Sequence, residues 1–203
     1  MLAANNKTDA ELVQLTLQDV EAFTYLIERY KKKLLRYIYR FSGIRPPEAE
    51  DILQEAFLKM YQNLNSFNFS LGFSAWAYRI TRNETINYLR KNKKHQENIS
   101  LSLSAEDKSI RDLLNVLADK TDLRQEISRK ELAGKIRKIL SLLPLNYREV
   151  LMLRFFEEKN YQEISDILRV PMGTVATLLN RAKKQAKILA EKDNLSFYLF
   201  TDE

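Results

Sequence analysis

The sequence predicts an all-α protein with two helical domains joined by a flexible linker. Apolar residues recur at helical spacing in several segments, whereas no run alternates between apolar and polar residues as a strand would. The 203 residues include only 4 Gly and 4 Pro, which favours long unbroken helices. A polar, serine-rich stretch over residues 96–120 separates two periodic halves, and we expect it to be the linker because it can bury little apolar surface.

The first half opens with two predicted helices. The capping-box pair Thr8 and Glu11 begins the first helix, whose apolar positions continue to Phe41 before Gly43 and a pair of prolines end it. The second helix, in "EAEDILQEAFLKMYQNL", has one apolar face and one acidic face. The acidic face would suit a basic partner surface, although a solvated helix face has the same pattern.

A third helix is predicted from about Ser74 to Lys91, where aromatic and basic side chains interleave. The loop before it, from Asn65 to Ser74, is rich in asparagine, serine and phenylalanine. Trp76 has Ile80 four residues further on and is expected in the core. Phe73 fits a core position and a base-stacking platform about equally well.

The second half contains a predicted helix that ends at Pro144, a short helix in "NYREVLMLRFFEE", and a helix-turn-helix pattern in "YQEISDILRVPMGTVATLLNRAKKQAK". Thr174 is expected to cap the second helix of this pattern, because threonine oxygen accepts a backbone hydrogen bond at such positions. The cations that follow, including Arg181 and Lys184, suit contacts with phosphates. The alternative is an αα-hairpin without a role in DNA binding.

The composition excludes several classes of chemistry. The chain has no cysteine and a single histidine, His95, so thiolate and His-rich metal sites are excluded and no cofactor is expected. No arrangement of acids, nucleophile and metal ligands indicates an enzyme. The net charge of +6 suits a polyanionic partner. No apolar run approaches the ~18 residues of a membrane span and no signal-peptide pattern is present, so we expect a cytoplasmic protein without stable membrane insertion.

The motifs resemble one protein family in both halves. "LPLNYREVLMLRFFEEKNYQEISDILRVPMGTVATLLNRAKKQAK" is similar to region 4, the −35-binding domain, of extracytoplasmic-function (ECF) RNA polymerase sigma factors of the sigma-70 superfamily. "DVEAFTYLIERYKKKLLRYIYRFSG", "AEDILQEAFLKMYQNLNSF" and "FSAWAYRITRNETINYLRKNKK" resemble region 2 in order and spacing. The resemblance implies region 2 over residues 1–95, a linker over 96–121, region 4 over 122–190 and a C-terminal tail over 191–203.

The resemblance implies an alternative sigma factor that binds the beta and beta-prime subunits of core RNA polymerase and directs promoter-specific transcription initiation. Catalysis would belong to the polymerase, and a cognate anti-sigma factor is expected as a further partner. The residues implied in core binding are Asp51, Gln54 and Glu55. Those implied at the −10 element are Phe73, Trp76, Arg79, Arg82, Asn83, Arg90 and Lys91. Those implied at the −35 element are Thr174, Ala176, Thr177, Asn180, Arg181 and Lys184.

The sequence departs from the family pattern in the predicted −35 helix. Relatives commonly have basic, small polar and basic residues after "GTV", whereas this chain has Ala176, Thr177 and Leu178. Arg169 occupies the turn position where glycine is frequent. Without an arginine for guanine, we expect softer reading through thymine methyl groups. The runner-up interpretation is a stand-alone helix-turn-helix regulator, and a third is an interaction protein that does not bind DNA.

Overall fold

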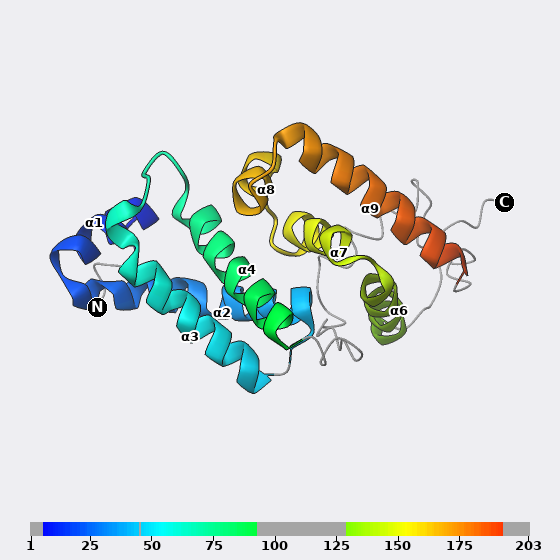
Figure 1. The fold of residues 1–203 in the computed structure, drawn as a ribbon, viewed down its shortest axis with the longest axis horizontal. Coiled ribbons are helices and arrows are strands. Elements are labelled where there is room, and N and C mark those ends of the chain that lie inside the picture. The colour runs from blue at the N-terminus through cyan, green and yellow to red at the C-terminus, as the bar shows by residue number, and fades with distance from the viewer. Residues whose placement is uncertain (1–5, 45, 93–128, 193–203) are drawn as a thin grey trace. The chain divides into compact units, whose positions relative to one another are not determined.

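The computed structural model describes residues 6–44, 46–92 and 129–192. The chain folds as two compact units, the first built on residues 1–98 and the second on most of the remainder. The described residues form helices, and no strand occurs among them, as the sequence predicts (Figure 1). The predicted linker over residues 96–121 lies outside the described residues, as do residues 193–203 of the predicted tail over 191–203.

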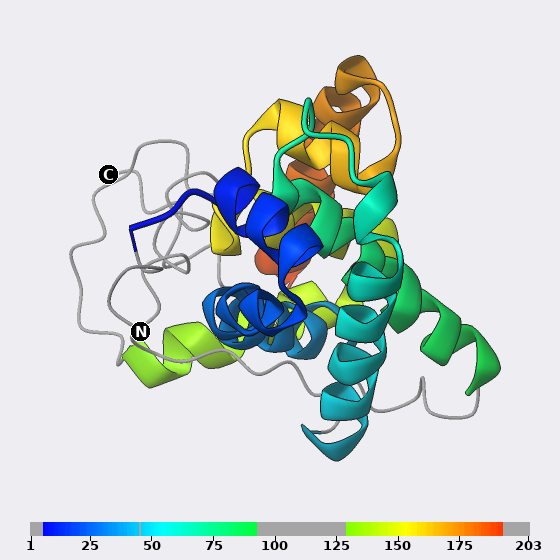
Figure 2. The ribbon, with the colours of Figure 1, turned by 90° about the vertical axis from the view of Figure 1, so that its left-hand side faces the viewer.

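The described residues of the first unit form four α-helices and two short 3-10 turns. In chain order these are α1 (Asp9–Gln18), η1 (Val20–Ala22), α2 (Phe23–Ser42), α3 (Pro46–Gln62), η2 (Leu64–Ser66) and α4 (Phe73–Lys91). Helices α3 and α4 run in opposite directions alongside each other, and both pack against α2 (Figures 1 and 2). The core between them includes Leu34, Tyr37, Met60 and Tyr78, all buried. Burial of these large side chains supplies most of the force that holds the helices together.

The predicted capping box is present, but the first predicted helix is in fact two. The Thr8 N–H donates to Glu11 Oε2 at 2.6 Å, and the Glu11 N–H donates to Thr8 Oγ1 at 3.3 Å. The helix then breaks at Asp19, which has an extended backbone with φ −137° and ψ 111°. The Asp19 carboxylate accepts from the Glu21 N–H at 3.0 Å and so begins a new turn. The break arises because the short side chain of Asp19 competes locally with the helix for backbone donors. The apolar pattern continues through this position and therefore does not reveal the break.

The second unit contains α6 (Arg129–Leu142), α7 (Leu145–Leu151), the π-turn η4 (Met152–Phe156), α8 (Tyr161–Leu168) and α9 (Met172–Lys192). The segment predicted as one helix after Pro144 therefore widens into a π-turn after its first seven residues. Helix α9 packs against α6 and α7. Arg148 joins α7 to the end of α6, donating from Nε to Leu140 O at 2.8 Å and from Nη2 to Ser141 O at 3.0 Å. These bonds satisfy carbonyls that a helix end leaves without intrahelical partners.

Among the described residues, no helix has both the length and the apolar character needed to cross a membrane. Within the same residues, no group of three or more His, Asp or Glu side chains is placed to hold a metal ion.

Candidate functional site

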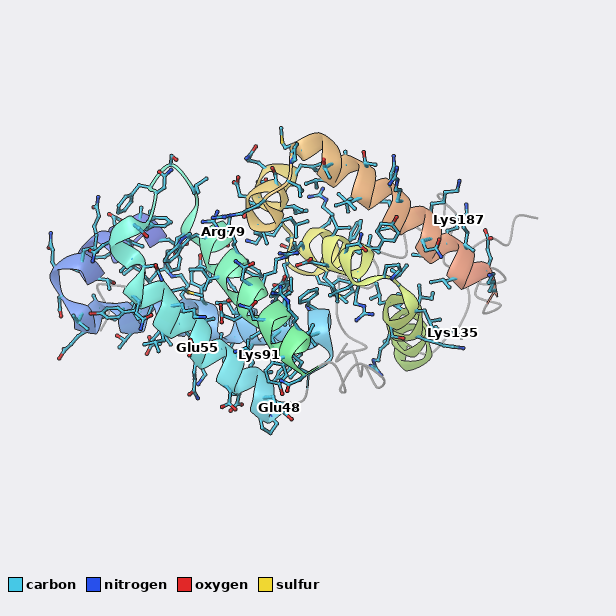
Figure 3. The ribbon with its side chains drawn as sticks, in the orientation of Figure 1. Glu48, Glu55, Arg79, Lys91, Lys135 and Lys187 are labelled. Atoms are coloured by element: carbon cyan, nitrogen blue, oxygen red, sulfur yellow. The ribbon has the colours of Figure 1, made fainter. Side chains whose placement is uncertain are left out.

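The acidic face of α3 is exposed, as predicted. Asp51, Gln54 and Glu55 all face solvent, whereas Ile52 and Ala56 on the same helix are buried. This separation follows from the helical period of 3.6 residues, which places positions 51, 54 and 55 on one side. The face therefore presents two carboxylates and an amide to solvent. Figure 3 shows Glu48 and Glu55 along this helix.

The sequence alone did not single out a lysine that joins α3 to α4. Lys59 Nζ lies 2.6 Å from Glu84 Oε2 on α4 and 3.6 Å from Glu55 Oε1 on α3. The Glu84 carboxylate, which accepts a hydrogen bond from the ammonium, raises the pKa of Lys59 above its usual value. Lys59 and Glu84 are 25 positions apart, so only the packing of the two helices reveals this link.

Two aromatic residues predicted at the −10 element lie in the core. Phe73 and Trp76 are 3% and 7% exposed. The Phe67 ring packs edge-on against both, at centroid distances of 5.8 Å to Phe73 and 5.2 Å to Trp76. Tyr30 packs on Phe73 at 5.3 Å. The expected core position of Trp76 is confirmed, but neither ring has an open face for a base, which argues against direct stacking by Phe73 or Trp76.

Phe69 is the exposed aromatic residue of the same loop, with 47% of its surface accessible. Its ring rests on Phe67 at a centroid distance of 5.1 Å. Asn68 shapes the loop here, because its side-chain Oδ1 accepts from the Ser70 N–H at 2.9 Å and its backbone oxygen accepts from the Leu71 N–H at 2.9 Å. An asparagine turn of this kind holds Phe69 at an exposed position above a packed aromatic base.

The polar side of α4 carries the remaining residues predicted at the −10 element. Asn83 is exposed in the middle of the helix, and Arg90 and Lys91 are exposed at its C-terminal end. Arg79 and Arg82 lie on the same helix, and Figure 3 shows Arg79 and Lys91 near opposite ends of it. Cations along the helix can follow a phosphate backbone, and an exposed amide can both donate and accept hydrogen bonds to a base edge.

Thr174 does not cap the predicted −35 helix. Helix α9 begins at Met172, and Pro171 O accepts from the N–H groups of Thr174 at 2.9 Å and Val175 at 3.1 Å. Thr174 is therefore an exposed residue of the first helical turn. Arg169, in the turn before α9, has a left-handed backbone with φ 56°. Glycine is the usual residue in that conformation. This explains why glycine is frequent at this turn position, where this chain has arginine.

The outward face of α9 is the one predicted from helical phase. Its exposed members are Ala176, Thr177, Asn180, Arg181 and Lys184, opposite the buried Val175, Leu179 and Ala182. The Thr177 hydroxyl donates to Gly173 O at 2.9 Å, so its hydrogen is already used within the helix. Lys183 lies over the Phe155 ring, with Nζ 5.8 Å from the centroid, and is directed toward α7 and its π-turn.

Comparison with known proteins places both halves of the chain in one family. The family described as Sigma-70 region 2 matches residues 26–95, and the family described as Sigma-70, region 4 matches residues 133–185. The ECF RNA polymerase sigma factor SigW of Bacillus subtilis is 35% identical over 174 residues, which cover 84% of this chain and 90% of that protein. The RNA polymerase sigma-H factor of Pseudomonas aeruginosa is 31% identical over 177 residues, covering 87% of this chain and 90% of that protein.

Solved structures agree with this fold. CnrH, in complex with the cytosolic domain of CnrY, matches with a TM-score of 0.65 and 20% identity, covering 92% of this chain and 99% of that one. The sigma factor RpoE of Bartonella quintana, in complex with the anti-sigma factor NepR, matches with a TM-score of 0.58 and 19% identity, covering 83% and 96%. The two region matches and the similarity to SigW over most of both chains show that this protein belongs to the extracytoplasmic-function family of sigma-70 RNA polymerase sigma factors and is an alternative sigma factor.

Proposed function

We propose that this sigma factor divides its task between its two units, with region 2 functions in residues 1–95 and region 4 functions in residues 122–190. The observation that carries the proposal is the presence in one chain of an exposed acidic helix face and a separate helix-turn-helix with outward cations. A protein that only binds duplex DNA needs no acidic helix face, whereas a sigma factor must bind both a protein and DNA.

Core RNA polymerase binds the acidic face of α3 in this proposal. Asp51 and Glu55 offer two carboxylates on one exposed side, with Gln54 between them. A basic helical surface on the beta-prime subunit would complement this face, and complementary charge increases association rate and fixes the register of docking. In the same complex, region 4 would contact the beta subunit and the −35 element.

The −10 element is bound by the loop before α4 and by the polar side of that helix. Phe69 supplies the exposed ring on which an unstacked base of the opened strand can pack, a contact worth about 1–3 kcal/mol. Asn83 bonds the base edge, while Arg79, Arg82, Arg90 and Lys91 contact the phosphates. Phe73 and Trp76 act beneath the loop as its packed support. Promoter opening becomes favourable because the surface stabilises a base that the duplex no longer stacks.

The −35 element is bound by α9. Arg181 and Lys184 contact phosphates and contribute affinity on any sequence, whereas Ala176 and Thr177 lie where base edges are read. Because the Thr177 hydroxyl donates to Gly173 O, its methyl group is the part of the side chain best suited to a thymine methyl. Thr174 and Asn180 flank this short reading surface.

Two further properties belong to the proposal. The chain carries no reaction of its own, and catalysis resides in the polymerase; its place of action is then the cytoplasm. An inhibitory protein partner is expected as well, because the similar structures hold CnrH with the cytosolic domain of CnrY and RpoE with the anti-sigma factor NepR.

The test combines capture of core polymerase with run-off transcription from a library of randomised promoters. The full chain should bind core polymerase and yield transcripts that share −10 and −35 sequences. A stand-alone regulator would instead bind duplex DNA with the same specificity in the absence of polymerase, and it would produce no transcripts. An interaction protein without DNA binding would show no salt-dependent binding to DNA at all.

A further inference from the structure

One ammonium group connects the acidic face of α3 to the helix that carries Asn83. Lys59 Nζ lies 2.6 Å from Glu84 Oε2 and 3.6 Å from Glu55 Oε1. The Glu84 side chain is 13% exposed, whereas that of Glu55 is 51% exposed. Lys59 is therefore shared between a largely buried carboxylate on α4 and an open carboxylate on the face proposed to bind polymerase.

The bond to Glu84 is the stronger of the two. Charge-assisted hydrogen bonds shorten and strengthen when one partner is shielded from water, and a buried carboxylate without its cation is costly. Glu55 is more exposed and 1 Å further from the ammonium, so water competes with that contact. Lys59 thus fixes Glu84 firmly while remaining in reach of Glu55.

Fixing Glu84 also fixes the direction of Asn83. The two residues are neighbours on α4, separated by about 100° around the helix axis. The buried hydroxyls of Thr81 and Thr85 donate to Ala77 O at 2.9 Å and Thr81 O at 2.8 Å, so both are used within α4. Interdigitated side chains, among them the buried Met60 and Tyr78, set the spacing of α3 and α4 and restrict how the two helices can rotate. The Lys59–Glu84 bond adds a directional polar contact to this packing, and it favours one rotation of α4 against α3.

We propose that Lys59 is a positioning residue that couples polymerase docking at Glu55 to capture of the −10 base at Asn83; this rests on the roles proposed for Glu55 and Asn83. A basic partner surface draws the Glu55 carboxylate to itself and repels the Lys59 ammonium. Glu84 then becomes the remaining acceptor of that ammonium, and the contact between α3 and α4 tightens. Docking thereby favours the orientation of Asn83 that receives the base.

The coupling is measured as a reciprocal effect on affinity. The affinity of the full chain for core polymerase is determined with and without a single-stranded oligonucleotide that carries the non-template −10 sequence from the selected promoters. The oligonucleotide should strengthen core binding by about fivefold in the wild type, and core should strengthen oligonucleotide binding by the same factor. Lys59→Met keeps the apolar stem but removes the charge, and the factor should fall to about one. Lys59→Arg should restore most of it.

A double-mutant cycle identifies Glu84 as the residue through which Lys59 acts. Glu84→Gln should reduce open-complex formation about as much as Lys59→Met does, with unchanged closed-complex binding. The double variant should be no worse than either single variant, because both remove one link. Additive losses in the double variant would overturn the proposal.

A matched ion pair in the same unit controls for general loss of stability. Arg29 Nη1 lies 2.7 Å from Asp9 Oδ1 and joins α2 to α1 rather than to α4. Arg29→Met should retain the coupling factor. The proposal fails if Lys59→Met keeps the full factor, or if Arg29→Met loses as much of it. Asn83→Ala separates failure of the coupling from failure of the −10 site. If Asn83→Ala impairs promoter opening and Lys59→Met does not, only the coupling is wrong. If Asn83→Ala leaves promoter opening unchanged, both proposals are overturned.

Discussion

The Phe69 ring packs against the Phe67 ring with centroids 5.1 Å apart and planes inclined at 70°. Phe67 in turn packs on Trp76, so an exposed ring stands on a buried aromatic layer. Edge-to-face pairs of this kind stabilise a ring beyond its buried area, by about 0.5–1.5 kcal/mol. The loop therefore holds the Phe69 ring in a fixed position. The side chain of Phe69 then loses less conformational entropy when a base binds to it.

Phe69→Leu should weaken binding of single-stranded −10 DNA by about 1–3 kcal/mol, because leucine keeps apolar bulk but has no π-face. Phe69→Tyr should retain binding. Fluorescence titration of the oligonucleotide measures both, and thermal unfolding should show little change in either variant. Phe73→Ala is the contrasting variant, since removal of a buried ring should destabilise the unit by about 3–5 kcal/mol. Equal DNA binding by Phe69→Leu and the wild type would remove Phe69 from the site.

Asn83→Ala should lower open-complex formation more than closed-complex binding, because only the opened strand offers an unstacked base to the amide. Permanganate reactivity of thymines near −10 measures opening, and filter binding on a non-melting duplex measures the closed complex. Identical permanganate patterns in the variant and the wild type would show that the assignment of Asn83 is wrong.

Reversal of charge at Asp51 and Glu55 to lysine should abolish core binding while the helical content stays the same, because like charges across an interface are strongly unfavourable. Pull-down of core polymerase and circular dichroism measure the two properties. Glu28→Lys is the control, since Glu28 is an exposed acidic residue of α2 and lies outside the acidic face of α3. Unchanged core affinity in the folded double variant would place docking elsewhere.

Arg181→Ala should reduce the slope of log affinity against log salt for −35 DNA by about one unit, if Arg181 neutralises one phosphate. Lys183→Ala is the matched control, because Lys183 lies over the Phe155 ring. Lys183→Ala should change the slope less than Arg181→Ala does. Equal slopes for Arg181→Ala and the wild type would exclude a phosphate contact by Arg181.

Ala176→Arg should strengthen DNA binding and create a preference for guanine at one −35 position, worth about 1–3 kcal/mol when both guanidinium bonds form. Selection from randomised −35 elements reads this preference directly. Residue 176 does not face the groove if the selected sequences match those of the wild type.

The local sequence pattern was sufficient to predict features that depend on a single helix. The exposed positions of α3 and α9 follow from the period of 3.6 residues, so the acidic face and the outward face of α9 could be predicted from the sequence. The capping box is equally local, because two residues three positions apart, Thr8 and Glu11, complete it. The family resemblance extended these local patterns to function.

Competing local hydrogen bonds and contacts between residues distant in the chain decided the features that the sequence did not reveal. Asp19 ends α1 and Pro171 supplies the first carbonyl of α9 because alternative local hydrogen bonds compete there, and periodicity does not rank such alternatives. Phe69 and Phe73 look alike in the sequence, yet the packing of Tyr30, Phe67 and Trp76 buries one and leaves the other exposed. The Lys59–Glu84 bond depends on how α3 rests against α4. The sequence thus determined the all-helical fold, the exposed faces of α3 and α9, and the family. Tertiary packing decided which aromatic ring is accessible and which charges meet, because burial and ion pairing depend on distances between residues far apart in the chain.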